Sequence, residues 1–130
     1  MKSRENLLRL KHFQVEDKTR QLAQIDMMIA EFEKMMGDLD AQINYEEDKA
    51  GITDTSHFAY PTFAKAARTR KENLEVSIRD LQDKRVDAEN ALTEADAELQ
   101  KAQALEQRDG GAGIVENVVD AQAERRAMIG

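Results

Sequence analysis

Few side chains in this chain of 130 residues have an obvious catalytic or metal-binding role. There are two histidines, His12 and His57, no cysteine, and 26 carboxylates of Asp and Glu. The two histidines lie far apart in the sequence, so each is interpreted as a surface imidazole and not as one half of a common site. Carboxylates on a solvated surface keep ordinary titration behaviour and are poor candidates for acid–base catalysis. We therefore expect no catalytic residue, no metal site, no cofactor and no enzymatic activity.

A glycine-rich stretch at residues 109–113 is the nearest approach to a phosphate-binding loop. It lacks the Lys-Ser or Lys-Thr pair of such a loop and follows a helical pattern instead of a strand, so we interpret it as a linker. Residues 109–130 would then be this linker and a short helical tail. Two interpretations of the tail stay open: a terminus that frays or folds back, and a partner-binding segment. Its apolar face contains Val115, Val118, Val119 and Ala123.

The composition is typical of long helices and not of a compact multilayered domain. Charged residues make up 35% of the chain and aromatic residues 5%, and there is one proline. The net charge of -7 argues against general nucleic-acid binding, which needs a surplus of Lys and Arg. No stretch approaches about 18 apolar residues, and the charged N-terminus lacks a signal-peptide core. These features predict a cytoplasmic protein without a membrane span.

A heptad pattern dominates the first part of the chain, because apolar residues recur at steps of three and four between Leu22 and Ile43. The pattern predicts a helix over residues 4–50 that packs against a partner helix in a coiled coil. Lys11 and Lys18 occupy two earlier seam positions, so this end of the helix is expected to be the looser one. The seam positions are Leu22, Ile25, Ile29, Phe32, Met36, Leu39 and Ile43.

A loop is predicted at residues 51–60, between two helices of nearly equal length. Gly51 follows the first helix as a C-cap glycine, and Pro61 suits the first turn of a second helix over residues 61–108. Small alanines in the second seam should allow the helices to approach closely. That seam contains Leu74, Ile78, Leu81, Ala88, Leu92, Ala95, Leu99 and Ala102.

The charges distinguish an antiparallel hairpin from a parallel dimer. If the chain folds back about residues 55 and 56, residue i faces a residue near 111 minus i, which brings the basic first twenty residues opposite the acidic stretch 86–109. A parallel dimer would bring like charges together. The predicted fold is therefore all-α: a long antiparallel two-helix coiled-coil hairpin over residues 1–108, with a short flexible C-terminal tail, monomeric in isolation.

Aromatic residues gather around the loop, which holds or adjoins four of the six Phe and Tyr side chains. They form either a plug that closes the hairpin or a recognition surface at its tip, and both uses can coexist with some rings inward and others outward. The doublets Met27-Met28 and Met35-Met36 each place one side chain off the seam, where Met is more often filler than a partner surface. The loop aromatics are Tyr45, Phe58, Tyr60 and Phe63.

Two stretches resemble the flagellar export protein FliJ family in its alphaproteobacterial form. One combines Leu8-Arg9-Leu10-Lys11 with the run from Val15 to Leu22, and the other, Tyr60-Pro61-Thr62-Phe63, opens the second helix. The resemblance covers residues 1 to about 108. It implies an antiparallel coiled-coil hairpin that acts as a stalk in the central hole of the hexameric flagellar export ATPase.

The resemblance also implies partners and a location. The partners are the export ATPase hexamer, the cytoplasmic domain of the export gate protein and export chaperones, in the cytoplasm at the inner face of the membrane at the flagellar base. The implied process is type III export for flagellum assembly, and hence motility and chemotaxis. Arg70 departs from the small apolar residue expected beside the gate contacts. The implied gate residues are Leu39, Tyr45, Phe58, Tyr60, Phe63, Ala67 and Leu74, and those for the ATPase ring are Lys2, Arg4, Arg9 and Lys11.

The sequence is also compatible with two other functions. A coiled-coil chaperone would hold apolar client segments with its aromatic tip, and a structural scaffold would associate with copies of itself.

Overall fold

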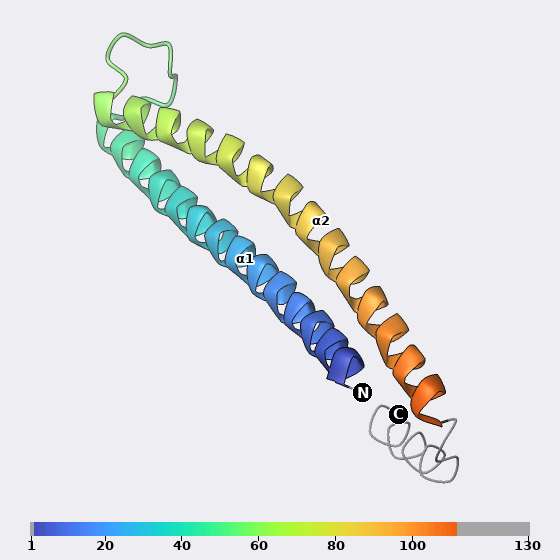
Figure 1. Ribbon diagram of the computed structural model, residues 1–130. Helices are drawn as coiled ribbons and strands as arrows, with labels where there is room; N and C mark the ends of the chain where they lie inside the picture. The colour runs from blue at the N-terminus through green and yellow to red at the C-terminus, as the bar shows by residue number, and fades with distance from the viewer. Residues whose placement is uncertain (1, 112–130) are drawn as a thin grey trace, which may run out of the picture. The chain divides into compact units, whose positions relative to one another are not determined.

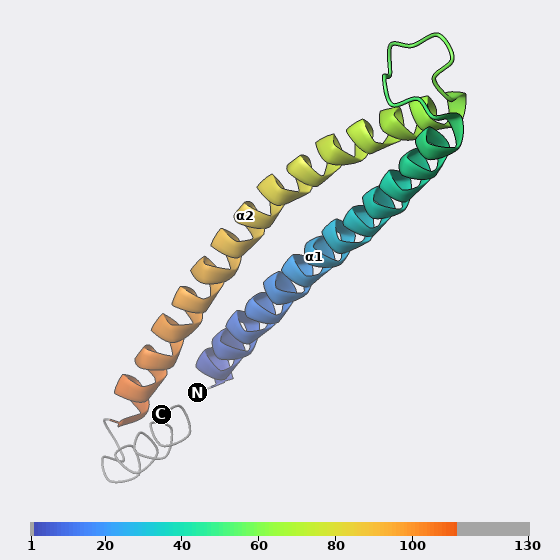
Figure 2. The same ribbon diagram turned by 180° about the vertical axis from the view of Figure 1, so that it is seen from behind.

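The computed structural model describes residues 2–111, with side chains described for residues 3–108. The described chain is all-α and consists of two long helices, α1 (Lys2–Ala50) and α2 (Thr62–Gly111). The helices run in opposite directions and lie side by side (Figures 1 and 2). The predicted antiparallel helical hairpin is confirmed. The predicted C-terminal tail from Ala112 lies outside the described residues.

The helix ends follow the signals in the sequence. Gly51 has a φ of 70°, and the N–H groups of Gly51 and Ile52 both donate to the carbonyl of Glu47, at 2.8 and 3.3 Å. This is the αL cap expected of a C-cap glycine. Pro61 accepts a hydrogen bond from Lys65 at 3.0 Å and so stands at the entry of α2. Beyond Arg108, α2 continues through residues 109–111, three residues past the predicted end.

The heptad seam of α1 faces inward as predicted. Each of its seven apolar positions is buried or half-buried, and Ile43 is the most deeply buried at 3% exposed. Lys11 and Lys18 are half-buried as well, because their aliphatic stems cover the seam. The pattern in the sequence therefore identified the packed face of α1.

The seam of α2 is longer than the sequence pattern indicated. All eight predicted positions are buried or half-buried, and inward positions at steps of three and four continue from Ala64 to Ala102. Lys71 and Arg85 occupy two of these steps and are half-buried. Because both side chains are charged, the apolar pattern does not identify them, although they lie on the same face of α2 as the apolar seam residues.

The ion pairs between the helices reveal the register. Lys71 Nζ lies 2.8 Å from Asp40 Oδ1, and Arg85 Nε lies 2.5 Å from Asp26 Oδ1. In both pairs the two residue numbers add up to 111, the value expected if the chain folds back about residues 55 and 56. Lys11 Nζ lies 2.5 Å from Glu98 Oε2, a pair whose numbers add up to 109. The position of the loop therefore predicted the register, and the charges predicted the antiparallel orientation.

The chain divides into two compact units, each built from a part of both helices. We call residues 20–89 the loop unit. Residues 1–19 together with 90–130 form the terminal unit, of which the part up to Gly111 is described. The loop unit buries six hydrophobic side chains: Ile43, Tyr60, Ala64, Ala67, Ile78 and Leu81.

Candidate functional site at the loop end

The loop between the helices is shaped by its own side chains. Asp54 Oδ1 accepts hydrogen bonds from the Ser56 N–H at 3.0 Å and from the Ser56 hydroxyl at 2.7 Å. The backbone N–H of His57 donates to the carbonyl of Asp54 at 3.1 Å. An Asp that bonds the residue two positions on forms an Asx turn, which local sequence alone can specify. The Ser56 hydrogen bonds hold the pKa of Asp54 below its ordinary value of 3.8.

A second turn contains an exposed aromatic residue of the loop. The carbonyl of His57 accepts from the Tyr60 N–H at 3.0 Å, and His57 Nδ1 accepts from the Ala59 N–H at 3.0 Å. The imidazole stacks on the ring of Phe58, with centroids 4.8 Å apart. Phe58 is nevertheless 97% exposed. Its ring is held on one side by His57 and open to a partner on the other.

Glu47, Tyr60 and Arg68, which we call the Glu47 cluster, join both helices to the loop. The Tyr60 hydroxyl donates to Glu47 Oε2 at 2.8 Å, and Arg68 Nε donates to the Tyr60 oxygen at 2.8 Å. Arg68 also donates to Glu47 Oε2, at 2.9 Å. Glu47 and Tyr60 are each 8% exposed. The cluster is a closed ring of three hydrogen bonds, two of them to an ionised carboxylate.

The charges in the Glu47 cluster stabilise each other. The hydrogen bonds from Arg68 and then from Tyr60 hold the pKa of Glu47 below its ordinary value of 4.5. The pKa of Arg68 is raised by its hydrogen bonds to Tyr60 and to Glu47. Glu47 is therefore ionised and Arg68 protonated at neutral pH.

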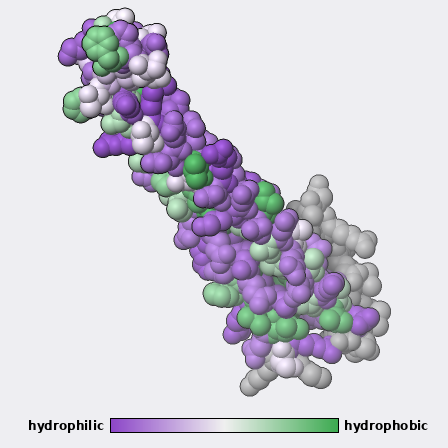
Figure 3. Space-filling view, turned by 90° about the horizontal axis from the view of Figure 1, so that it is seen from above, coloured by the Kyte–Doolittle hydropathy of each residue, from purple (hydrophilic) through white to green (hydrophobic). Residues whose placement is uncertain are grey.

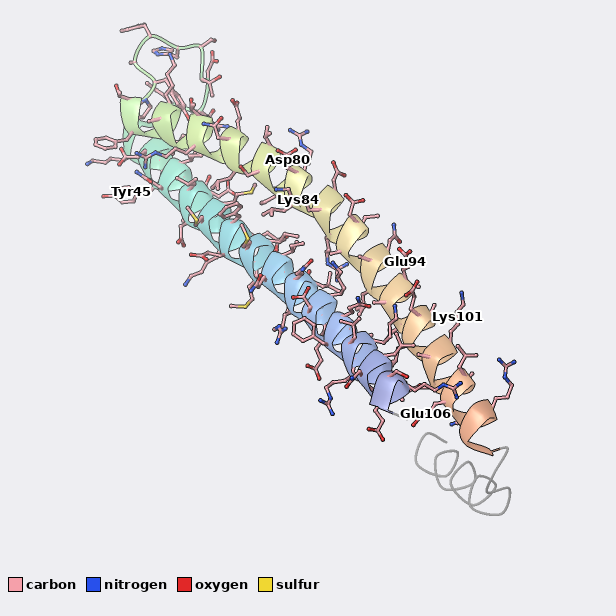
Figure 4. All side chains as sticks on the ribbon, viewed as in Figure 1. Tyr45, Asp80, Lys84, Glu94, Lys101 and Glu106 are labelled. Carbon is pink, nitrogen blue, oxygen red and sulfur yellow. The ribbon has the colours of Figure 1, made fainter. Side chains whose placement is uncertain are left out.

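The aromatic residues near the loop separate into one inward ring and three outward rings. Tyr60 is buried, whereas Phe58, Phe63 and Tyr45 are 97%, 69% and 63% exposed. Figure 4 places Tyr45 on α1 close to the loop, and Figure 3 shows a hydrophobic side chain standing out at the loop end of a mainly hydrophilic surface. The structure thus combines the two alternatives that the sequence left open, with one ring inward and three outward. We call Tyr45, Phe58 and Phe63 the aromatic tip.

The remaining residues expected at the gate contact lie on the helices of the loop unit. Ala67 is 3% exposed and packs in the seam, so with Tyr60 it supports the tip instead of presenting a surface. Leu39 and Leu74 are half-buried and line one groove of about 430 Å³. The sequence assigned no binding role to the rest of the groove lining: Met35, Asp38, Gln42, Arg70, Asn73 and Ser77.

One signal for this groove was visible in the sequence. Met35 is the off-seam member of a methionine doublet and is 44% exposed. Arg70, the residue that departs from the family pattern, lies on the groove wall formed by α2, and Asp38 lies on the wall formed by α1. The groove is therefore lined by apolar side chains together with an acidic residue from α1 and a basic residue from α2.

The residues expected at the ATPase ring are in the terminal unit. Arg9 is exposed and Arg4 is half-buried. Lys11 is bonded to Glu98 across the two helices, so its ammonium group already has an intramolecular partner. The side chain of Lys2 lies outside the described residues. Arg9 is thus the most accessible of the described cations in this set.

The groups considered for chemistry do not come together in the described part of the chain. His12 is exposed in the terminal unit, and His57 belongs to the loop unit. Among residues 2–111, no group of three His, Cys, Asp or Glu side chains is placed to hold a metal ion. Neither of the two described helices is long and apolar enough to cross a membrane.

We find no protein-family model, curated protein or solved structure that matches this chain. The site is therefore interpreted from its own geometry.

Proposed function

We propose that the chain is a docking protein that binds a protein partner with its aromatic tip. The observation that carries this proposal is the exposure of three aromatic side chains in and beside the loop, of which Phe58 is 97% exposed. Exposed aromatics of this kind are favoured as binding anchors, because they bury a large area and have little side-chain entropy to lose. The stacked His57 and the Asx turn at Asp54 reduce that loss further.

The particular assembly we propose is the flagellar type III export apparatus. Support comes from the FliJ-like stretches around Leu8 to Leu22 and Tyr60 to Phe63, together with the helical hairpin that such a stalk requires. In this proposal the terminal unit enters the ring of the export ATPase, with Arg9 as an accessible cation. The aromatic tip meets the cytoplasmic domain of the export gate, at the inner face of the membrane at the flagellar base. Export chaperones are the third class of partner.

The proposal is tested by two measurements on the full chain. Added to its cognate export ATPase at low salt, the chain is expected to raise the rate of ATP hydrolysis while showing none alone. In a titration with the gate's cytoplasmic domain, Phe58→Ala with Phe63→Ala is expected to weaken binding at least tenfold, about 1.4 kcal/mol or more.

Phe13→Ala is the matched control for the second measurement. It removes an aromatic ring that is 56% exposed in the terminal unit and should leave gate binding unchanged. Circular dichroism checks that all variants keep their helicity. Failure to bind or stimulate the ATPase, together with unchanged gate binding by the double variant, would reject the proposal.

A chaperone that holds apolar client segments is the second candidate, favoured by the groove at Leu39 and Leu74. Its lining of apolar side chains with one acidic and one basic residue suits one face of an amphipathic client helix. Met35→Gln should then lower affinity for the client peptide while leaving ATPase stimulation unchanged. Equal client affinity of this variant and the native chain would remove the groove from consideration.

A further inference from the structure

The Glu47 cluster connects the two ends of the loop through one residue. The backbone carbonyl of Glu47 accepts from Gly51 and Ile52, where the chain leaves α1. The side chain of the same residue accepts from Tyr60 and Arg68, where the chain enters α2. Glu47 is thereby bonded to both stems of the loop, and at 8% exposed it is the buried charged residue of the described chain.

The other hydrogen bonds of the loop join residues that are close together in the sequence. Asp54 bonds Ser56 and His57, and His57 bonds Ala59 and Tyr60, all within a few residues. These bonds define the shape of the loop but do not attach it to the helices. The Tyr60 side chain makes that attachment on the α2 side, since its hydroxyl bonds Glu47 of α1 and Arg68 of α2.

The position of Tyr60 in the sequence links this attachment to the aromatic tip. Phe58 lies two residues before Tyr60, and Phe63 lies three residues after it. With the ring of Tyr60 directed inward, both neighbours are highly exposed. A Tyr60 released from the cluster would let the loop sample other orientations, in which Phe58 is not held in its exposed position.

We infer that the Glu47 cluster is the positioning device of the docking surface: it holds the loop in the conformation that presents Phe58 to the partner. Glu47, Tyr60 and Arg68 act here through other residues and need not touch the partner. Holding a loop in its bound conformation raises affinity because less order is lost on binding. The part of this inference that concerns affinity rests on the proposed function, whereas the part that concerns the loop does not.

The experiment on the loop uses Tyr60→Phe in the full chain, which removes one hydroxyl and keeps the ring. In this variant, amide hydrogen exchange followed by NMR should show about tenfold less protection of the backbone amides at Ser56, Ala59 and position 60. A decrease of this size is expected when a hydrogen bond to a charged group is lost. Amides of the α2 seam, at Ile78 and Leu81, should keep their protection. Equal losses in the loop and the seam would indicate general destabilisation and overturn the inference, as would unchanged loop protection.

Tyr45→Phe is the matched control for exchange, because it removes a hydroxyl from a tyrosine that is 63% exposed. No change in loop protection is expected for it. Substitutions at Glu47 give a graded series, since they spare the backbone carbonyl that caps α1. Glu47→Gln keeps an acceptor for Tyr60 and should lower loop protection less than Glu47→Ala does.

The experiment on affinity uses the same variants with the gate's cytoplasmic domain as the probe. Tyr60→Phe should weaken binding about tenfold in the native background and much less in a Phe58→Ala background, because the cluster acts through Phe58. Equal effects in the two backgrounds would overturn the inference. If Phe58→Ala with Phe63→Ala leaves binding unchanged, the proposed function fails, while loop protection still decides whether the cluster positions the loop.

Discussion

The loop unit and the terminal unit carry the same heptad pattern but bury it to different depths. Six of the seven buried hydrophobic side chains among the described residues lie in the loop unit, and the seventh, Ala102, lies in the terminal unit. In the terminal unit the other apolar seam positions, Leu8, Val15, Leu92, Ala95 and Leu99, are half-buried. Periodicity therefore predicts which face is inward, but not how tightly that face is packed.

The difference follows from the side chains that fill the seam. In the loop unit Ala64 and Ala67 are almost fully buried beside the loop, where the chain reverses and the helices are held by the Glu47 cluster. Cations take up seam positions in both units, but the two in the terminal unit, Lys11 and Lys18, are a larger share of its shorter seam, which has no deeply buried alanine pair beside a loop. Stems that end in a charge cover apolar surface without closing it off from water.

The largest difference between the two units is expected in the free energy of unfolding when one seam side chain in each is shortened to alanine. Ile43→Ala in the loop unit removes a side chain that is 3% exposed and should lower the free energy of unfolding by about 2 to 4 kcal/mol. Leu99→Ala in the terminal unit removes a half-buried side chain and should cost less than half as much. Urea unfolding followed by circular dichroism measures both. A terminal variant as destabilised as the loop variant would refute the difference in packing.

A smaller effect is expected in local stability. Amides of α1 before Arg20 and of α2 after Glu89 should exchange at least about tenfold faster than those around Ile43 and Ile78, a difference of about 1.4 kcal/mol. The reason is that the terminal unit buries few large side chains. Hydrogen exchange on the full chain provides the measurement. Uniform protection from Leu8 to Leu105 would contradict the prediction.

The smallest effect is expected from pH. Because the folded-state pKa of Glu47 lies below 4.5, its stabilising contribution is present above that value and is lost as the pH falls through the lower folded-state pKa. Glu98 in the terminal unit, whose pKa is lowered by Lys11, follows the same rule. The Tm difference between the native chain and Glu47→Gln should therefore shrink between about pH 7 and about pH 3. The corresponding difference for Glu98→Gln should be smaller at neutral pH, because this pair is more exposed.

Most of the fold could be predicted from the sequence, because coiled-coil packing is governed by short-range periodicity and charge. The seam from Leu22 to Ile43, the cap at Gly51 and the antiparallel register were all anticipated. Lys71 and Arg85 were not recognised as seam positions, because the seam was traced through apolar residues alone. The end of α2 was placed too early because a glycine lowers helix propensity by only about 1 kcal/mol and does not by itself end a helix.

Less of the site could be predicted. The clustering of aromatics near the loop indicated a tip, but the sequence does not distinguish the buried ring of Tyr60 from the exposed rings beside it. That distinction is made by Glu47 and Arg68, which lie 13 residues before and 8 residues after Tyr60. The groove at Leu39 and Leu74 likewise requires side chains from both helices.

The ion pairs between the helices also act against misfolding. A slip of one heptad in either direction would place Asp40 opposite Ala64 or Ile78 instead of Lys71. The apolar seam repeats every seven residues and tolerates such a slip, but an unpaired carboxylate beside buried apolar groups does not. Because seam cations stand at Lys71 and Arg85 and not at every heptad, they distinguish the correct alignment from one shifted by a single heptad, and the chain can find that alignment before any partner is present.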